Sequence, residues 1–326
     1  MLSTLTSLSL LLFLVNARVW NDTGDGSIVF EEAWTTPGLL FQSRFMVLSC
    51  ASPCVQGLTD PDNATATATA INDELANLIS NNTLRFGAFA ALAMQDPVAA
   101  AAELNRTVTE LGFLGALVND YQEIGPSDNS KLQVTYLFYD QPEYDVFWQM
   151  VVDLDVPIYF HPRTNIPPVS TLMWSHSSFL RGPVQEFAVT LSSHILGLCV
   201  NGVFDRFPGL KVIVGHLGER VPSDIWRIND QLQRQLAFGM PMQQNVTAYL
   251  QKNIFETTSG NFATDLLQFH IDQIGESQIL YSVDYPYVTM EQGEAWLENE
   301  LPAVLHKDAI LALKRGRAIE LLGLNR

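Results

Sequence analysis

Three residues that can bind a metal ion or move a proton each follow directly on an apolar, strand-like run. These residues are His161, His216 and Asp284, and Glu219 lies three positions after His216. In α/β barrels the catalytic side chains come from the carboxyl ends of several strands, because the loops there meet at one face. Imidazole and carboxylate groups gathered at that face support metal binding or general acid–base chemistry. The pattern therefore predicts one site built from these four residues.

The elements that position these residues alternate along the chain between strand-like and helix-like patterns. Strands are predicted near residues 27–30, 44–50, 84–94, 115–119, 156–161, 210–216, 254–260 and 279–284. Helices are predicted at 71–80, 97–111, 141–153, 183–204, 222–236 and 266–274, and residues 61–70 are predicted to be an exposed, Thr- and Ala-rich connection. Such alternation predicts a parallel sheet, and eight strand units predict closure into a (β/α)8 TIM barrel.

The composition fits one catalytic domain. The chain has 326 residues, of which 47% are hydrophobic and 16% are charged, so it can bury a large core. This length lies in the upper range for a single barrel, and we predict that residues 18–326 form one domain. The net charge of −17, without a cluster of Lys or Arg, argues against nucleic-acid binding. An acidic surface is more simply a solubility feature.

The first 17 residues have the features of a secretory signal peptide. They contain no charged side chain, and they carry an apolar run at residues 8–15 before Ala17. The run is too short to span a bilayer, so we expect no membrane anchor. The mature protein is then expected to begin near Arg18 and to be secreted. The alternative is a buried N-terminal helix.

Sequons and cysteines support the secretory route. Glycosylation sequons begin at Asn21, Asn63, Asn81, Asn105 and Asn245. Cys50 and Cys54 are close enough in sequence to form a disulfide in an oxidising compartment, and the alternative is two free thiols beneath a loop. The third cysteine, Cys199, is then unpaired, and we expect it to be buried on an apolar helix.

A barrel would bring further carboxylates to the same site. The first strand ends in Glu31, next to the eighth strand with Asp284, and the fifth strand with His161 faces them across the mouth. One imidazole and two carboxylates can bind a divalent cation and leave coordination positions open, as a catalytic metal requires. Glu32 is interpreted as a solvated neighbour of Glu31. The structural alternatives are a core histidine at His161, a turn residue at Asp284 and a helix cap at His216.

Several longer motifs contain these residues. They are Glu31-x-Ala33, Phe-His-Pro-Arg163, the segment 202–219 that ends in Gly-His216-Leu-Gly-Glu219, Thr-Ser-Gly-Asn-Phe262 and Ser-Val-Asp284-Tyr-Pro286. Together they resemble the amidohydrolase superfamily, and more narrowly its metal-dependent, nonoxidative decarboxylases of the aminocarboxymuconate-semialdehyde and hydroxybenzoate group. The resemblance extends from about Phe30 to Asn325. Glu31-x-Ala33 is most similar to the 2,3-dihydroxybenzoate decarboxylases.

The resemblance implies a metal-ligand set. Glu31, His161 and Asp284 would bind one divalent ion per chain, Zn2+, Mn2+ or Mg2+. Ala33 stands where many relatives have a second ligand histidine, and a site with fewer nitrogen ligands leaves Mn2+ and Mg2+ credible beside Zn2+.

The resemblance also implies the reaction. His216 and Glu219 would handle protons beside the metal, and Asp284 could itself deliver a proton to the ring. The substrate would be an aromatic acid with a hydroxyl ortho to the carboxylate, similar to 2,3-dihydroxybenzoate or salicylate, which loses carbon dioxide. Relatives of this kind are typically dimers or tetramers. Arg163 would either recognise the substrate carboxylate or form an internal ion pair.

Some positions depart from the family pattern, and other functions stay open. The family commonly has an arginine three residues after His194, where this chain has Gly197, and relatives often have an acid where this chain has Val288-Thr289. The remaining histidines are expected to be structural: His176, His194, His270 and His306. The alternative functions are a metal-dependent hydrolase of a cyclic ester, which the same barrel can host, and a secreted, non-catalytic ligand-binding relative.

Overall fold

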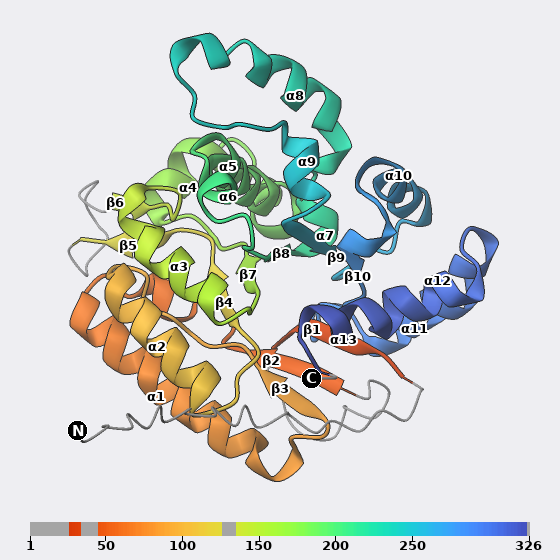
Figure 1. Ribbon diagram of the computed structural model, residues 1–326, viewed down its shortest axis with the longest axis horizontal. Helices are drawn as coiled ribbons and strands as arrows, with labels where there is room; N and C mark the ends of the chain where they lie inside the picture. Colours follow the sequence, from red (N-terminus) through yellow and green to blue (C-terminus); the bar gives the residue numbers. More distant parts are fainter. Residues whose placement is uncertain (1–25, 34–44, 126–134, 325–326) are drawn as a thin grey trace, which may run out of the picture.

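Eight parallel strands form the centre of the molecule (Figure 1). The computed structural model describes residues 26–33, 45–125 and 135–324. In chain order the strands are β1 (Ile28–Ala33), β2 (Phe45–Ser49), β3 (Phe86–Ala88), β4 (Ala116–Asn119), β7 (Ile158–His161), β8 (Val212–Val214), β9 (Ile254–Thr257) and β10 (Ile279–Leu280). Hydrogen-bonded ladders join β1, β2 and β3, and join β4, β7, β8, β9 and β10.

Two contacts connect these ladders into a barrel. A parallel bridge between Ala90 and Ala116 joins the end of the β3 segment to β4. The backbone N–H of Phe30 donates a hydrogen bond to Ser282 Oγ at 3.2 Å, so the first strand meets the segment that follows the last one. The chain thus has the (β/α)8 barrel fold that the sequence predicts.

Successive residues of each strand pack on opposite sides of this barrel, as the two-residue period of a strand requires. One set of buried side chains fills the interior and includes Phe30, Val47, Phe89, Tyr159 and Leu280. The other set faces the surrounding helices and forms the larger core. Because both faces are covered, the strands are mostly apolar and show little alternation in sequence.

Helices surround the barrel on its outer side (Figure 1). The longer ones are α1 (Pro61–Ile79), α2 (Pro97–Thr109), α3 (Asp145–Asp153), α5 (Glu186–Val200), α8 (Ile225–Gln233), α10 (Thr264–Ile274) and α11 (Met290–Asn299). The shorter ones are α4 (Pro167–Trp174), α6 (Val203–Arg206), α7 (Gly215–Gly218), α9 (Val246–Leu250), α12 (Lys307–Leu311) and α13 (Arg317–Leu321). In the described chain, none of the helices has the length and apolarity needed to cross a membrane.

Helix α1 corrects one expectation. Residues 61–70 were expected to be an exposed connection, but they form the first half of this helix. Asp60 caps it by accepting a hydrogen bond from the Asn63 N–H, and Pro61 occupies the first turn, where its missing N–H costs nothing. Ala64 and Ala68 are buried against the barrel, so packing overrides the weak helix propensity of the threonines.

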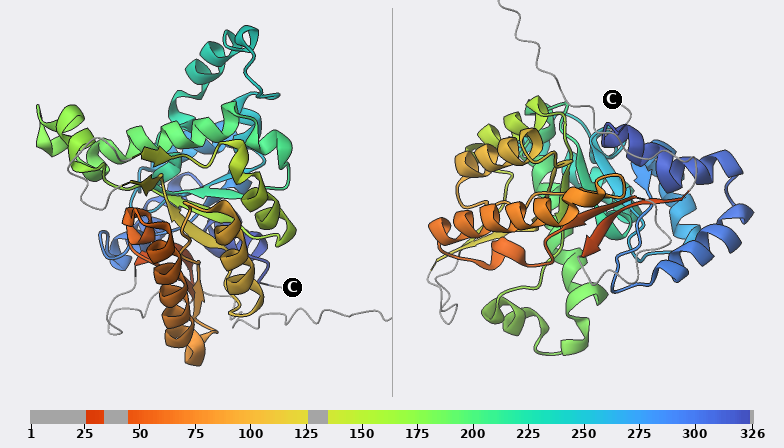
Figure 2. Two further views of the ribbon diagram at one scale, coloured as in Figure 1. Left: turned by 90° about the vertical axis from the view of Figure 1, so that its left-hand side faces the viewer. Right: turned by 90° about the horizontal axis from the view of Figure 1, so that it is seen from below.

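Two features were not expected from the sequence. An antiparallel hairpin of β5 (Gln122–Ile124) and β6 (Thr135–Leu137) follows β4. The segment with α4 extends away from the barrel body, as Figure 2 shows. Both come from loops at the carboxyl ends of strands, which in barrels carry the variable parts of the active site.

A β-bulge interrupts the pairing of β1 with β2. Ile28 and Val29 pair with Phe45 and Met46, whereas Glu32 and Ala33 pair with Leu48 and Ser49. One extra residue of β1 therefore lies between the two halves of the ladder. Bulges of this kind are frequent next to active sites, where they redirect a side chain.

Candidate active site

The cavity at the carboxyl ends of the strands brings the predicted residues together. His161, His216, Glu219 and Asp284 all line this cavity, which has a volume of about 620 Å3. They come from the ends of β7, β8 and β10, far apart in sequence. The sequence-based prediction of one shared site is therefore consistent with the geometry.

His161 ends β7 and has a defined tautomer. Its Nδ1 lies 2.6 Å from the carbonyl oxygen of Pro162. A carbonyl only accepts hydrogen bonds, so Nδ1 carries a proton, and in the neutral ring Nε2 then has the lone pair. A metal-binding histidine is typically oriented in this way, with its other ring nitrogen bound to a carbonyl or carboxylate.

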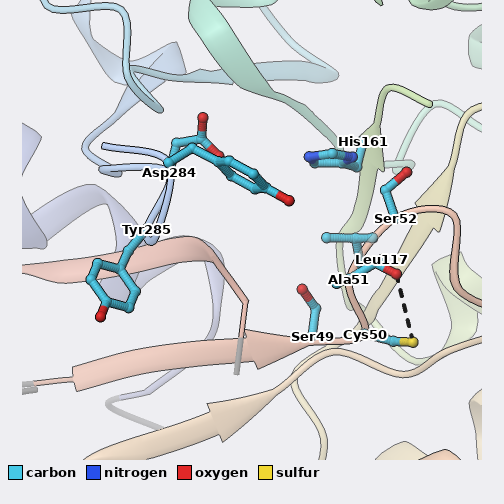
Figure 3. A pocket seen from close by; sticks show the side chains of 9 residues that line it. Ser49, Cys50, Ala51, Ser52, Leu117, His161, Asp284 and Tyr285 are labelled. Carbon is cyan, nitrogen blue, oxygen red and sulfur yellow. Dashed lines mark hydrogen bonds between the residues drawn. The ribbon is translucent and has the colours of Figure 1, made fainter. Parts of the chain in front are cut away.

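His161 and Asp284 also share a smaller pocket of about 40 Å3 at the bottom of the site. Figure 3 shows the two side chains on opposite sides of this pocket, with Ser49 and the loop from Cys50 to Ser52 below them. A pocket of this size has room for an ion or a water molecule.

His216 and Glu219 form a close pair. Nδ1 of His216 lies 2.7 Å from Oε1 of Glu219, whose side chain is only 7% exposed. Nε2 of His216 lies 3.9 Å from Oδ2 of Asp284, and the His161 and His216 rings are 6.2 Å apart. The buried carboxylate fixes the orientation of the His216 ring. Nε2 is therefore the ring nitrogen placed toward Asp284.

An unusual backbone turn presents this pair. Residues 216–220 all have positive φ angles, between 45° and 68°, and only Gly218 among them lacks a Cβ atom. Left-handed backbone is unfavourable for residues with a Cβ atom, and runs of it are rare. Within this turn, Nδ1 of His216 and the Glu219 carboxylate lie 2.7 Å apart.

Surrounding polar side chains hold this turn. Asn261 Nδ2 donates to the His216 carbonyl at 3.4 Å. A Cβ atom on Gly218 would meet the Glu256 side chain at 3.1 Å, so the turn lies directly on Glu256. Glu256 is fully buried; burial raises the pKa of its carboxyl, and its hydrogen bond to His270 at 2.7 Å acts in the opposite direction. His270 in turn contacts Ser223 Oγ at 3.1 Å, just after the turn.

Two of the three predicted metal ligands, His161 and Asp284, are described by the structure, and their donor atoms fit a divalent ion. His161 offers an imidazole nitrogen and Asp284 a carboxylate, a combination that suits Mn2+ or Mg2+ as well as Zn2+. The third predicted ligand, Glu31, lies on β1, and its side chain is outside the described residues, as is that of Glu32. Among the side chains that are described, no group of three His, Cys, Asp or Glu residues forms a metal site.

A model of the amidohydrolase family matches residues 51–324 of this sequence. The chain belongs to the amidohydrolase family. Among its relatives, the gamma-resorcylate decarboxylase of Polaromonas sp. is 40% identical over 255 residues, which cover 78% of this chain and 76% of that protein.

Two solved structures similar to this amidohydrolase are decarboxylases. The 2,6-dihydroxybenzoate decarboxylase from Rhizobium has a TM-score of 0.84 at 33% identity, covering 92% of this chain and 99% of its own. A dihydroxybenzoic acid decarboxylase from Polaromonas sp. was solved with manganese and the inhibitor 2-nitroresorcinol. It has a TM-score of 0.82 at 33% identity, and the match covers 93% of this chain and 98% of that one. This amidohydrolase therefore belongs to the decarboxylase group of the superfamily.

Arg163 of this amidohydrolase does not line the cavity. It is 4% exposed and forms an ion pair with buried Glu123. Its guanidinium also donates to the Gln56 carbonyl at 2.8 Å and lies over the Tyr121 ring at 4.7 Å. Of the two roles that the sequence leaves open, the structure shows the internal ion pair. A buried guanidinium needs such a partner, which explains the arrangement.

The departures from the amidohydrolase pattern have local explanations. A Cβ atom at Gly197 would collide with the Asp140 carboxylate, which accepts a hydrogen bond from Asn201 at 2.9 Å. Thr289 caps α11, and Val288 lines the cavity with an apolar side chain.

Two of the histidines expected to be structural are buried and do not line the cavity. His194 is buried, contacts Asp120 at 3.0 Å through Nδ1 and accepts the Tyr139 N–H through Nε2. His270, also buried, bonds Glu256 as described above.

The predicted disulfide forms part of the wall of the amidohydrolase site. Cys50 and Cys54 are bonded, and Cys199 is free and buried. Ser52 within the closed loop donates to the Pro162 carbonyl at 3.2 Å, the same carbonyl that orients His161. The disulfide thus holds a segment that contacts the histidine loop.

We expect the free energy of unfolding of the Cys50→Ser, Cys54→Ser double variant to be about 2 kcal/mol lower than that of the wild type. The disulfide closes a five-residue loop and so lowers the conformational entropy of the unfolded chain, which corresponds to that free energy. Urea unfolding of the oxidised proteins measures the loss. As a control, reductant should lower the stability of the wild type by the same amount and leave the double variant unchanged. Equal stability of the oxidised wild type and the variant would contradict the prediction.

The sequon asparagines that the structure describes are all at the surface of this amidohydrolase. These are Asn63, Asn81, Asn105 and Asn245, whereas Asn21 and the predicted signal peptide lie outside the described residues. Surface positions are compatible with glycans.

Proposed function

We propose that this protein is a metal-dependent, nonoxidative decarboxylase of aromatic acids with a hydroxyl ortho to the carboxylate, such as 2,3-dihydroxybenzoate or salicylate. The observation that carries the proposal is the arrangement of His216 between Glu219 and Asp284, in a cavity that His161 also lines. The relatives named for 2,6-dihydroxybenzoate and gamma-resorcylate support an aromatic acid of this class.

The reaction replaces the carboxylate on a ring carbon with a proton, so the protein must deliver that proton. His216 can hold it on Nε2, 3.9 Å from Asp284, while Nδ1 is bound to Glu219. The Glu219 carboxylate keeps the imidazole ring of His216 in one orientation. The proton forms a new C–H bond at the ring carbon. The electrons of the broken C–C bond return to the ring as carbon dioxide leaves, so no redox cofactor is required.

His161, Asp284 and Glu31 are proposed to hold the divalent ion. When bound, such an ion neutralises and orients the ortho-hydroxyl and carboxylate oxygens of the substrate. The apolar side chains of Phe187 and Val288 also line the cavity and provide contact surface for an aromatic ring.

The test is carbon dioxide release from a panel of hydroxybenzoates. Salicylate, 2,3-dihydroxybenzoate and 2,6-dihydroxybenzoate should be decarboxylated, and 3-hydroxybenzoate, which lacks the ortho-hydroxyl, should not. The same enzyme is assayed for hydrolysis of phenolic lactones. Lactone cleavage without carbon dioxide release would favour the hydrolase, and release from 3-hydroxybenzoate at an equal rate would remove the ortho-hydroxyl requirement.

We propose further that the protein is secreted. The support is the leader at residues 1–17, the exposed sequon asparagines and the Cys50–Cys54 disulfide, which is typical of oxidising compartments. After expression in a secreting eukaryotic host, the intact mass should correspond to a chain starting near Arg18 with N-linked glycans. A mass that retains Met1 and contains no glycan would refute this.

A homo-oligomer is also proposed. The segment that extends from the barrel carries Leu172 and Phe179, which are 75% and 87% exposed and are large apolar side chains. Exposed apolar side chains on a projecting segment are common at subunit contacts. Light scattering after gel filtration should give a mass of two or four chains, and a monomer at micromolar concentration would contradict it.

A further inference from the structure

Arg220 is a cation at a site that is otherwise acidic. Among the described residues that line the 620 Å3 cavity, it is the only Lys or Arg. It directly follows Glu219, so it belongs to the same wall of the cavity as the proposed proton-handling pair. The whole chain has 35 acidic and 18 basic residues, which makes a cation at this position a specific feature rather than a general one.

The backbone of Arg220 is in an unfavourable conformation. Its φ angle is 68°, in the left-handed region that favours glycine. A long side chain gains nothing from this conformation, and glycine or asparagine would adopt it at lower cost. Such residues persist mainly at ligand sites, where the side chain is needed.

Neutral partners hold the guanidinium at the rim of the cavity. Nη1 donates to Gln185 Oε1, and Nη2 donates to the Val184 carbonyl at 2.9 Å. Val184 is 56% exposed, so this end of Arg220 lies near solvent. Within the described chain, no carboxylate is in ion-pair contact with it. A guanidinium has five N–H groups, so three remain after these two bonds.

We propose that Arg220 binds a second anionic group of the substrate, a carboxylate distant from the one that leaves. This inference rests on the proposed function and names its substrate class: an ortho-hydroxy aromatic acid with an additional carboxylate. His161 and Asp284 hold the reacting end of the substrate at the bottom of the cavity, and Arg220 lies toward the rim of the cavity. A cavity of 620 Å3 falls in the range that holds ligands larger than one small ring. The planar guanidinium, already oriented by Gln185 and Val184, matches the geometry of a carboxylate.

The test compares salicylate with 4-hydroxyisophthalate, which is salicylate with a second carboxylate para to its hydroxyl and meta to the carboxylate that leaves. The wild type should prefer the dicarboxylate in kcat/KM. In Arg220→Gly, which relieves the backbone strain, the ratio of the two kcat/KM values should fall about 10- to 100-fold, the usual scale for a charge-assisted hydrogen bond. Arg220→Lys keeps the charge and should retain part of the preference. Arg181→Gln removes a nearby exposed charge outside the cavity and should keep the wild-type ratio.

Binding separates this inference from the proposed reaction. Isophthalate and benzoate lack the ortho-hydroxyl, and calorimetry measures their affinities without turnover. Isophthalate should bind the wild type more tightly, and Arg220→Gly should lose that advantage even if no acid is decarboxylated. The inference is overturned if the wild type has no preference for the dicarboxylate. It is also overturned if Arg220→Gly lowers kcat/KM for both substrates equally. Arg220 would then have only a structural role, in which it connects the turn at residues 216–220 to Val184 and Gln185.

Discussion

Replacing His216 with asparagine is expected to lower kcat on an ortho-hydroxy acid by about two or more orders of magnitude, the usual effect of losing a positioned general acid or base. The variant should keep its metal and bind the substrate, because His216 is paired with Glu219 rather than placed in the proposed ligand set. Stopped assays of carbon dioxide release, with metal analysis of the same preparation, measure both quantities.

Glu219→Gln is the matched control. It removes the charge that orients the ring but leaves the imidazole in place, so kcat should fall by a smaller factor. Asp284 cannot serve as the control, since it is both a proposed ligand and 3.9 Å from His216 Nε2. Normal turnover by folded, metal-loaded His216→Asn would exclude this histidine from the mechanism. A metal-free His216→Asn protein would instead place it among the ligands.

Metal content is expected to depend on His161 and Asp284. His161→Ala and Asp284→Asn should lower metal affinity by more than about 10- to 100-fold, the cost of disturbing even an outer partner of a metal site. Purified wild type should contain about one ion per chain. Inductively coupled plasma mass spectrometry, after dialysis against a weak chelator, measures the loss together with the identity of the metal.

Glu31 and Glu32 provide an internal comparison for the same experiment. Glu31→Gln should lose the metal, and Glu32→Gln should keep it. The bulge between Val29 and Glu32 adds one residue to β1, so simple alternation along the strand does not decide which of the two carboxylates faces the site. A metal-free Glu32→Gln protein with a loaded Glu31→Gln protein would reverse the assignment.

The barrel and the position of its site could be predicted from the sequence, because both follow from local patterns. His161 and Asp284 each follow a run of residues that is buried on both faces, and parallel strands bring their carboxyl ends to one side. The Cys50–Cys54 pair is separated by only four positions, so chain geometry favours its closure. These inferences require no knowledge of contacts between distant residues.

The remaining features depend on tertiary contacts that no local pattern encodes. The sequence left Arg163 open between substrate and ion pair, and its partner Glu123 lies on a hairpin that was not foreseen. The left-handed turn at 216–220 depends on packing over Glu256, which is separated from it by a long stretch of chain. Arg220 gives no signal in the sequence, because an arginine after a glutamate is an ordinary surface pattern. Only its φ angle and its place in the cavity distinguish it.

The hydrogen bond between Phe30 and Ser282 joins residues that are 252 positions apart. At about 5–20 residues per second, roughly 10 to 50 s of translation separate the synthesis of the two. Throughout that interval the outer edge of β1 has no neighbour from the last strand, and an open strand edge is a template for pairing with other chains. A chain that terminates before residue 282 would keep this edge permanently, so truncated products should aggregate rather than form a smaller, partly active enzyme.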